Sequence, residues 1–591
     1  MNLPPSSRRQ FLQTSLSLTT LSLVPGTLRA QSAHVTPDIV RRLTALLDDR
    51  IRARLDGATE PERRGPSHRS LGRWFVALSS AYVNPDSVFR QDPRLPPELL
   101  RTAQRLAALQ TADGTFNAGN IESPPDTAFA ITDLAQALAL LRRAPESGLA
   151  EVVAALTAVL QRSGEGLVVG GVHTPNHRWE ICAALTRLHA VLPDARYPRR
   201  VEEWLAEGID IDAEGQYAER SPNYSGEVVN PSLLTVALVG NRPALLEAIR
   251  RNLDLTLHQT EPNGEVETVA SRRQDQAPSF RRPIWLFYVP LRALALIDRN
   301  PTFAAAVEWI ERDFTSDIVD TLPDLLDLPG LAAPLPAVGE VPSSYVRHFP
   351  VSHVVRVREG TMSATVFGGT DWHLGLGALS GLSTNPTFFK FRRGAAILDS
   401  IRMSPSFFRM GHFRSQGLTV TGPHSWLLRQ EAAAAYHHPL PPAARRADGD
   451  YAMSFDGRFY SKMAFGERPK QWKRLITEVE VRRVDSGFDL EFRCSGQEGV
   501  PVTIEVCFRT GGVLTGTEKT SRTGLRLLGA GERATYRVGS DTISVGPGLT
   551  VGEPSMDAGE RYAWHQGSLT IEGERVYLTA RSPFQHTLQI R

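Results

Sequence analysis

The hydrophobic pattern of this chain changes its period once, and this change constrains the fold more than any other feature. From about residue 36 to 320, apolar side chains recur at helical spacing, as Leu43 and Leu47 do. From about residue 343 onward, apolar and polar residues alternate, starting with the run at Val354. A chain of this kind is expected to segregate its helices and strands rather than to form βαβ units.

The helical part predicts a toroid or solenoid of many helices joined by polar loops. Turn signals such as Asn263-Gly264 separate the periodic segments, and no repeat of fixed period is present, which disfavours tetratricopeptide and HEAT arrays. We therefore expect an (α/α) toroid over residues 31–320. The clearest predicted helices after the first three periodic segments are 148–162, 177–191, 198–207, 242–258, 283–298 and 301–313.

The alternating part predicts an antiparallel β-sandwich over residues 343–591, preceded by a linker at 321–342 that is rich in Pro, Leu and Asp. An irregular stretch around Pro441 is expected to be a loop within this region. The predicted strands include 458–465, 474–483, 487–494, 501–509, 533–538, 541–545, 568–572 and 575–581.

Composition and charge exclude some classes of protein. The chain has 591 residues, of which 41% are hydrophobic, so a large buried core is expected and global disorder is not. Its 66 basic and 64 acidic residues give a net charge of +2, which provides no argument for a nucleic-acid partner. Three cysteines are too few for a disulfide framework. For Cys494 and Cys507 the alternatives are a pair between neighbouring strands and two free, buried thiols, and we expect the thiols.

The N-terminus has the features of an export signal. Arg8 and Arg9 precede a mildly apolar stretch that is too short to span a membrane. We interpret residues 1–30 as a twin-arginine signal peptide, with a mature chain that starts near Gln31. The mature protein is then expected to be periplasmic or secreted, without a membrane partner. The alternative is a chance pair of arginines before an apolar segment.

Polar residues cluster at loops of the helical part, close to predicted helix starts. Asn176 and His177 open the helix 177–191, together with Arg178 and Trp179. These residues offer donors, a titratable base and a stacking face, which an anionic sugar requires. The alternatives are that Asn176 is a helix N-cap and that His177 is a surface histidine.

Two further loops carry candidate residues. In the first, Tyr217 and Tyr224 flank Glu219 and Arg220. Cations next to a tyrosine favour its phenolate, although loop tyrosines often only pack and form hydrogen bonds. In the second, residues 271–275 include Arg273 and Gln274, which either line the same cleft or form a solvated charged loop.

The arrangement resembles the heparinase II/III-like and alginate-lyase-like polysaccharide lyases, which join an (α/α) toroid to a β-sandwich. The motifs that carry the resemblance are 176–179, 219–224 and the Phe-rich segment 388–399. In such lyases an Asn or His neutralises a uronate carboxylate, and a tyrosine some fifty positions later acts as acid and often as base. Here Asn176 and Tyr224 are 48 positions apart.

The resemblance implies a function and a set of site residues. The expected reaction is β-elimination on an anionic, uronic-acid-containing polysaccharide, in which Asn176 and His177 neutralise the carboxylate and Tyr224 acts as acid, with Tyr224 or His177 as base. Trp179 is expected to stack on a sugar ring, and Arg220 and Arg273 to hold flanking carboxylates. The predicted substrate-binding residues are Arg178, Trp179, Tyr217, Glu219, Arg220, Arg273 and Gln274.

The sequence departs from this family at one motif. The family carries a His-x-His-x-Asp type segment before the Phe-rich strand, which supplies a catalytic histidine and in some members helps to bind a structural metal. Residues 379–388 contain no histidine, so no cofactor or metal site is expected there. His353 is our candidate for the second catalytic histidine. The other candidate histidines of this part are His348, His373, His412 and His424.

Two other functions are compatible with the sequence. A glycoside hydrolase on the same toroid needs two carboxylates across one cleft. A non-catalytic glycan-binding protein is the second alternative, because the histidine motif is missing. The carboxylates available to a hydrolase are Asp113, Asp126, Glu180, Glu219 and Glu227.

Overall fold

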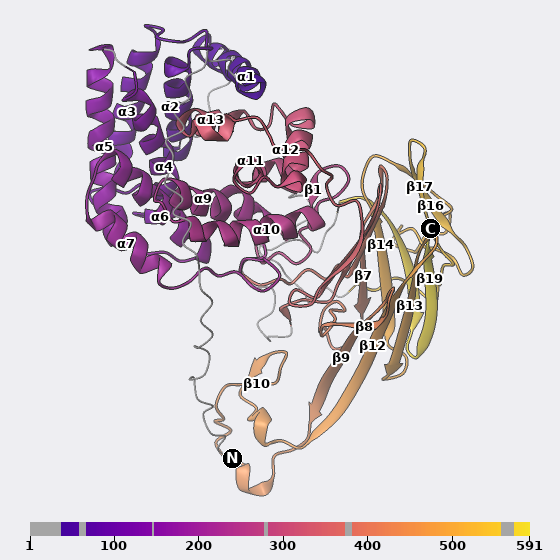
Figure 1. Ribbon diagram of the computed structural model, residues 1–591. Helices are drawn as coiled ribbons and strands as arrows, with labels where there is room; N and C mark the ends of the chain where they lie inside the picture. Colours follow the sequence, from indigo (N-terminus) through magenta and orange to yellow (C-terminus); the bar gives the residue numbers. More distant parts are fainter. Residues whose placement is uncertain (1–36, 58–66, 145–146, 277–281, 373–380, 557–571) are drawn as a thin grey trace, which may run out of the picture. The chain divides into compact units, whose positions relative to one another are not determined.

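The computed structural model describes residues 37–57, 67–144, 147–276, 282–372, 381–556 and 572–591. Residues Pro37–Arg591 form one compact unit. Helices come first along the chain and two antiparallel sheets follow, which confirms the predicted combination of a helical toroid and a β-sandwich (Figure 1). The predicted signal peptide lies outside the described residues.

The helices form two concentric layers. In the inner layer each helix packs against the next one, and each inner helix has an outer helix as neighbour. The inner helices are α2 (His68–Val83), α4 (Pro124–Leu141), α6 (Pro175–Val191), α9 (Asn230–Leu238) and α11 (Tyr288–Ile297). The outer helices are α3 (Leu95–Leu109), α5 (Ala150–Val169), α7 (Arg196–Leu205), α10 (Leu246–Gln259) and α12 (Pro301–Asp313).

The two layers differ in how their helices are patterned. Helix α6 is buried around most of its circumference, whereas α7 buries only Tyr197 and Val201. A helix that is apolar on one stripe lies at a surface, and one that is apolar all round lies inside. The burial pattern of each helix therefore indicates whether it lies in the inner or the outer layer. Helix α2, which was not among the predicted helices, begins directly after its N-cap residue Ser67.

The ring of helices is closed by the segment that was expected to be a linker. Helix α13 (Leu322–Asp327) contacts α1 (Asp38–Leu55), α2 and α4. Arg187 of α6 donates to Asp327 at 2.7 Å and is 5% exposed. The predicted linker 321–342 is thus helical in part and packs against the inner helices.

One helix of the described residues, α5, is long and apolar enough to cross a membrane by length and composition alone. In the structure this helix packs against α3, α4 and α6. Its apolar face contributes Leu156, Leu160 and Leu167 to the core of the toroid.

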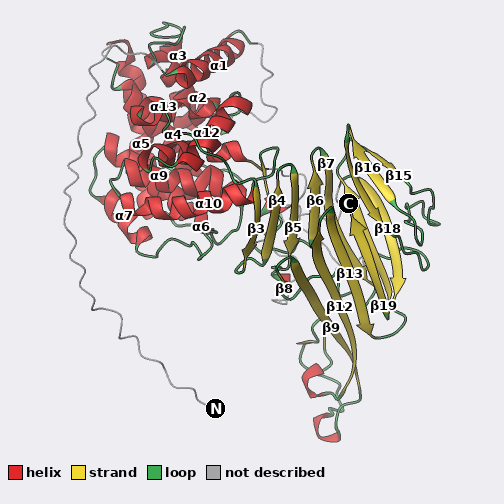
Figure 2. Cartoon of the chain, turned by 45° about the vertical axis from the view of Figure 1, so that its right-hand side comes forward, coloured by secondary structure: helices red, strands yellow, loops and turns green. Residues whose placement is uncertain are grey.

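Two antiparallel sheets pack face to face in the second part of the chain (Figure 2). Their inner faces share one apolar core, in which Phe389 contacts Phe488 edge to face. One sheet has the order β18 (Glu574–Arg581), β14 (Pro501–Phe508), β7 (Ala396–Pro405), β6 (Phe389–Arg393), β5 (Met362–Phe367), β4 (Val354–Glu359), β3 (Ser344–Phe349). The other has the order β15 (Val513–Thr515), β16 (Ala534–Val538), β17 (Asp541–Gly546), β19 (Phe584–Ile590), β13 (Gly487–Gly496), β12 (Lys470–Val484), β9 (Ser425–His437), β8 (Leu418–Gly422).

The predicted strand 458–465 is wrong. Only Tyr460–Ser461 (β11) is extended there, paired with β10 (Ser454–Phe455) in a small hairpin. Asp456 and Gly457 lie in the turn of this hairpin, and Gly457 has φ of 101°, a value that favours glycine. Most of the predicted strand 568–572 lies outside the described residues. All three cysteines are free and buried, as expected.

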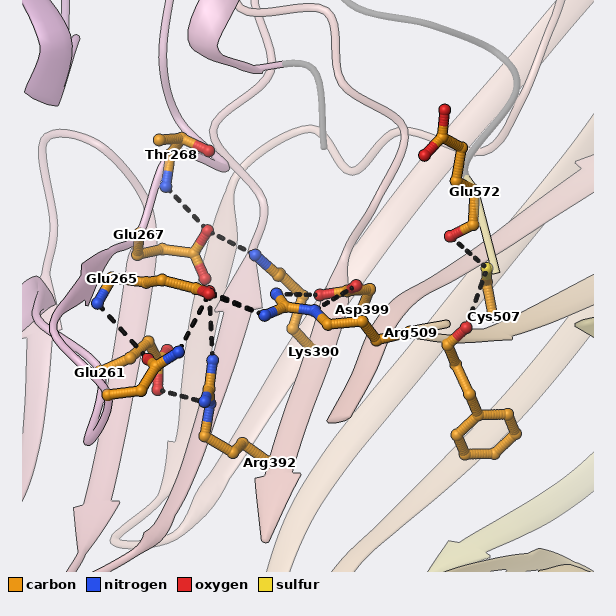
Figure 3. Close-up of polar contacts among 12 residues, drawn as sticks. Glu261, Glu265, Glu267, Thr268, Lys390, Arg392, Asp399, Cys507, Arg509 and Glu572 are labelled. Carbon is orange, nitrogen blue, oxygen red and sulfur yellow. Dashed lines mark hydrogen bonds and ion pairs between the residues drawn. The ribbon is translucent and has the colours of Figure 1, made fainter. Parts of the chain in front are cut away.

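A buried network of ion pairs joins the toroid to the seven-stranded sheet (Figure 3). Arg356 of β4, which has no exposed surface, donates to Glu261 at 2.7 Å. Lys390 of β6 donates to Glu267 at 2.8 Å, and Arg509 donates to Glu265 at 2.8 Å. All three glutamates follow α10 in the loop that carries the short strand β1 (Glu265–Val266). This loop is therefore fixed to the sandwich by charge.

Glu267 shows the strength of this network. Burial would raise the pKa of its carboxyl, but the charges of Lys390 and Arg356 outweigh burial and lower that pKa to about 2. A carboxyl of lowered pKa stabilises the fold at pH values above its unfolded pKa of about 4.3. This stabilisation is lost as the pH falls from there to about 2.

We expect Glu267→Gln to lower the thermal midpoint strongly at pH 7, because it leaves Lys390 and Arg356 with uncompensated charge. Removing one partner of a buried ion pair costs about 3–5 kcal/mol. The variant should also lose less stability than the native chain between pH ~4.5 and ~2. Thermal unfolding followed by circular dichroism across this pH range measures both effects.

The matched control is Asp313→Asn, which removes a carboxylate from an exposed pair with Arg312. Exposed pairs contribute little to stability, so its midpoint should hardly move. Equal midpoints for the two variants would show that the interface network does not stabilise the fold.

Candidate active site

Tyr224 stands at a local irregularity of the toroid. It ends the single helical turn α8 (Pro222–Tyr224) and is followed by a π-helical turn, Ser225–Val229, before α9. The Ser221 hydroxyl caps this start by accepting from the Tyr224 backbone N–H at 3.2 Å. π-Helical turns occur often at functional sites, because they move a side chain out of the regular helical register.

Asp275 joins the Tyr224 loop to the loop of Arg273 and Gln274. Its buried carboxylate accepts from the Ser221 hydroxyl at 2.8 Å and from the Asn223 backbone N–H at 3.1 Å. The other carboxylate oxygen accepts from the Ser271 hydroxyl. The two loops, some fifty residues apart in sequence, are thereby held in one register.

The Tyr224 hydroxyl is fixed by two donors. Arg273 donates to its oxygen at 3.0 Å and Gln274 at 2.9 Å, and the Arg273 guanidinium lies 4.1 Å from the centre of the Tyr224 ring. A phenol oxygen has two acceptor positions and one proton. Because both acceptor positions are used, the hydroxyl proton is available to a third group.

Glu219 continues the chain of hydrogen bonds. Its carboxylate accepts from Asn176 at 2.5 Å and pairs with Arg273. Burial raises the pKa of the Glu219 carboxyl, although Arg273 and Asn176 oppose this. Asn176, Glu219, Arg273, Tyr224 and Gln274, all predicted site residues, thus form one connected cluster.

Asn176 and His177 each leave a buried polar atom without a protein partner. Because a carboxylate is only an acceptor, the Asn176 nitrogen faces Glu219, and its Oδ1 has no partner among the described residues. His177 Nδ1 also has none within the described part of the chain. A buried polar atom without a partner costs free energy, which a bound ligand removes. Thr174 precedes the helix as N-cap, so the capping interpretation of Asn176 is wrong.

His177 is neutral at ordinary pH. Burial, with His173 stacked at 4.8 Å between ring centres, lowers the pKa of His177 to about 4. A neutral imidazole accepts a proton but provides no positive charge. His177 is therefore free to accept a proton, as a weaker base than an ordinary imidazole, and does not neutralise a carboxylate by charge.

A cavity of about 450 Å³ inside the ring of helices reaches Tyr224. Its wall includes carboxylates and arginines as well as apolar side chains. Burial raises the pKa of Asp133 to about 7, although Arg73 opposes this shift. The polar residues of the wall that bear on chemistry are Arg69, Arg73, Asp133, Arg187, Asn223, Tyr224, Glu227 and Asp324.

Three predicted binding residues are structural instead. Trp179 is fully buried and its indole N–H donates to Asp210 at 3.0 Å, so it cannot stack on a sugar. Arg178 pairs with Glu207 and Asp210. Tyr217 is buried and its hydroxyl donates to Asn230 at 2.8 Å. In each case the sequence shows a suitable group but not the side of the element on which it lies.

Arg220 and His353 lie at the junction with the sandwich. Arg220 donates to the backbone oxygens of Val351 and Gly369, at 3.3 and 3.5 Å. His353 lies in the turn between β3 and β4, not on a strand, and accepts from the Leu418 backbone N–H at 3.4 Å. The described contacts do not connect either residue to the Tyr224 cluster.

The segment that lacks the family's histidines adjoins the candidate site. The Gln276 side chain donates to the Leu382 backbone oxygen and accepts from the Thr384 backbone N–H at 3.3 Å. The Asp371 carboxylate accepts from Arg272 of the toroid and from the Ser383 backbone N–H of the sandwich part, so it links the two parts. These donors do not fit a zinc site, and the described residues contain no cluster of three metal-ligating side chains. His373 lies outside the described residues.

Sequence reasoning missed several residues that build the site. Asp275 belongs to the loop 271–275, which was predicted to line the cleft or to form a solvated charged loop, and it was given no role of its own; Asp133 and Asn223 were not among the predicted site residues. Asn223 also has a buried Oδ1 without a partner in the described structure. The one available signal was the motif Ser221-Pro222-Asn223, in which a capping residue and a proline start a helix just before Tyr224.

Comparison with known proteins agrees with the fold. The sequence matches no protein-family model, and no curated protein matches it significantly. The structure of heparinase III aligns with a TM-score of 0.55 and 11% identity, over 88% of this chain and 76% of that one. A chondroitin AC lyase from Streptomyces coelicolor A3, solved with chondroitin sulphate, aligns with a TM-score of 0.52 and 14% identity, over 95% and 80%. The chain therefore has a polysaccharide lyase fold, as the resemblance implied.

We expect His177 to titrate near pH 4 and His173→Ala to raise this pKa, because His173 opposes the charged form of His177. Nuclear magnetic resonance of ring-labelled histidines measures the titration, and His177→Gln assigns the signal. His189→Ala, a substitution at an exposed histidine of the same helix, is the control and should leave the titration unchanged. A pKa near 6.5 for His177 would contradict the described burial.

Proposed function

We propose that this chain is a polysaccharide lyase that cleaves a uronic-acid-containing polysaccharide by β-elimination. The observation that carries the proposal is the Tyr224 hydroxyl, which two donors hold while its proton stays available. Asn176 belongs to the same hydrogen-bonded cluster, and its Oδ1, like His177 Nδ1, has no partner among the described residues. The fold, shared with heparinase III and chondroitin AC lyase, supports the same class of reaction.

The reaction has two requirements that this cluster meets. The proton on C5 of a uronate is weakly acidic while the neighbouring carboxylate is ionised, so the site must neutralise that carboxylate and stabilise the enolate. Arg273 supplies the positive charge, and the Asn176 amide nitrogen, which donates to Glu219 in the free protein, is the donor that the uronate takes over. Glu219, whose pKa burial raises, takes up a proton when a second carboxylate binds beside it.

Proton transfer then completes the elimination. Neutral His177 accepts the C5 proton, the electron pair forms the C4–C5 double bond, and the C4–O bond breaks. Tyr224 donates its proton to the leaving oxygen, and Arg273 and Gln274 stabilise the phenolate that remains. Tyr224 can also serve as the base when both transfers occur on one face of the sugar.

A glycoside hydrolase is the second candidate, and one observation favours it. Asp133, Glu227 and Asp324 line the same cavity as Tyr224. A carboxyl whose pKa burial raises to about 7, as at Asp133, has the value that a general acid needs near neutral pH. Hydrolysis adds water and leaves no double bond, whereas elimination leaves an unsaturated uronate that absorbs in the ultraviolet.

We also propose that the chain is exported through the twin-arginine pathway. The support is Arg8-Arg9 followed by a short apolar stretch. Export would place the enzyme where extracellular polymers are.

We expect Tyr224→Phe to lower kcat at least about 100-fold on the polymer that the native chain cleaves, because general acid–base catalysis contributes about 10²–10⁴-fold. The thermal midpoint should change little, since the ring and its contact with Arg273 remain. Initial rates of ultraviolet absorbance measure the effect, on a panel of alginate, glucuronan, heparan, chondroitin, hyaluronan, ulvan and rhamnose–glucuronate polymers.

Tyr217→Phe is the matched control. It removes the same atom from a buried tyrosine whose hydroxyl donates to Asn230, so it should cost stability and leave kcat nearly unchanged. Near-native turnover of Tyr224→Phe would remove Tyr224 from the mechanism. New reducing ends without absorbance would favour the hydrolase, and binding without any product would favour a glycan-binding protein.

A further inference from the structure

The far end of the β9–β12 hairpin differs from the rest of the sandwich. Strands β9 and β12 pair from Ser425 to His437 and are joined by a long excursion that contains the small hairpin β10–β11. Figures 1 and 2 show this excursion beyond the ends of the two strands. We call residues 436–474 the hairpin end.

The hairpin end is rich in exposed aromatic side chains. In the described part of the chain, every aromatic residue among the exposed large hydrophobic side chains lies within it. Exposed aromatic rings cost solvation free energy and occur where a partner covers them. These rings, with their exposed fractions, are Tyr436 (58%), Phe455 (45%), Phe459 (50%), Tyr460 (70%) and Trp472 (50%).

The rings are held in place by contacts within the hairpin end. Phe455 and Tyr460 pair across the β10–β11 hairpin with ring centroids 4.7 Å apart. Arg458 pairs with Asp456 at 2.6 Å and donates to the Ala435 backbone oxygen at 3.1 Å. The excursion is therefore attached to β9, and its aromatic surface is formed before any ligand arrives.

Positive charge gathers at the same place. The hairpin end has eight Lys and Arg residues against four Asp and Glu, although the whole chain has a net charge of only +2. It also contains three of the five lysines of the chain, Lys462, Lys470 and Lys473. Neither Lys470 nor Lys473 has a carboxylate partner among the described residues.

Trp472 combines the two features. It lies on the outer face of β12, because Leu475, Thr477 and Val479, which alternate with that face, are buried. Lys470 Nζ lies 5.5 Å and Arg474 Cζ 5.9 Å from the centre of its ring. An apolar ring face flanked by two cations matches a pyranose ring that carries carboxylate or sulfate groups.

We propose that the hairpin end is an accessory binding site for an anionic polysaccharide, with Trp472 and the exposed rings of β10–β11 as stacking surfaces and Lys470 and Arg474 as anion contacts. This inference rests on the proposed function, since it takes the same polymer class as ligand. The site retains a long polymer on the enzyme and takes no part in bond cleavage. Short substrates that fill only the catalytic cluster gain nothing from it.

The test measures binding in the Tyr224→Phe background, where turnover does not interfere. Dissociation constants for heparan, chondroitin and alginate polymers are measured by affinity electrophoresis at fixed salt. Trp472→Ala should weaken binding of the preferred polymer at least about fivefold, since it removes an exposed stacking surface. Lys470→Gln should also weaken binding and should reduce its dependence on salt.

Matched controls separate the site from general effects. Lys519→Gln removes an exposed lysine outside the hairpin end, and Val513→Ala removes an exposed apolar side chain from the far edge of the same sheet. Both should leave the dissociation constants unchanged. In the active chain, Trp472→Ala should raise KM for the long polymer and leave kcat, and all rates on a short oligosaccharide, as they are.

Three results would overturn the proposal. Unchanged polymer binding by all hairpin-end variants would remove it directly. A change only in sedimentation, with Trp472→Ala dissociating a dimer, would show that a second copy of the chain covers the rings. Tighter binding of oligo(dT) than of any uronate polymer would show a single-stranded nucleic acid site.

Failure of the accessory site and failure of the proposed lyase function give different experimental results. A polymer that binds through Trp472 but yields no unsaturated product would refute the lyase and support the hairpin end. An unsaturated product whose formation and binding are unaffected by Trp472→Ala would support the lyase and refute the accessory site.

Discussion

The loop between α10 and α11 is fixed by buried carboxylates at both ends, and the candidate active site depends on this. At its start, Glu267 lies among the cations of the sandwich, held by Lys390 at 2.8 Å. At its end, Asp275 accepts from Ser221 and from the Asn223 backbone N–H. Both groups are buried, where ionic hydrogen bonds are strong and their loss is costly. The sandwich therefore acts as a support that places Arg273 against Tyr224, although it donates no side chain to the described cluster.

The chemistry follows from how this support arranges charge. Glu219 and Arg273 compensate each other in the free protein, so the cluster tolerates burial without a ligand. Asn176 Oδ1 and His177 Nδ1 are without partners in the described structure. The charges of Glu219 and Arg273 cancel when the site is empty, so a bound anion shifts a proton onto Glu219 and leaves no unpaired charge.

The sequence predicted the architecture well because the spacing of apolar residues reflects the local backbone geometry of each helix or strand. This spacing can be read from each segment without knowing its partners. The structure brings the predicted residues Asn176, Glu219, Tyr224, Arg273 and Gln274 into one hydrogen-bonded cluster, and their role in a site stays a prediction. The sequence indicated them through polar loops near predicted helix starts and through the family resemblance. Trp179 and Tyr217 were misassigned, since the side of an element on which a ring lies depends on its neighbours in space. The roles of Glu267 and Asp275 were out of reach for the same reason: their partners lie about 50 to 120 residues away in the chain.

The central claim is that the Tyr224 cluster performs an elimination, and the mass of the product tests it most directly. Mass spectrometry of oligosaccharides released by the native chain from its preferred uronate polymer, in water enriched in oxygen-18, separates the two reactions. The account predicts products that are one water lighter than hydrolysis products, without heavy oxygen from the cleavage step. Products with a full added water and one heavy oxygen at the new end would contradict it and would assign the chemistry to the carboxylates of the cavity.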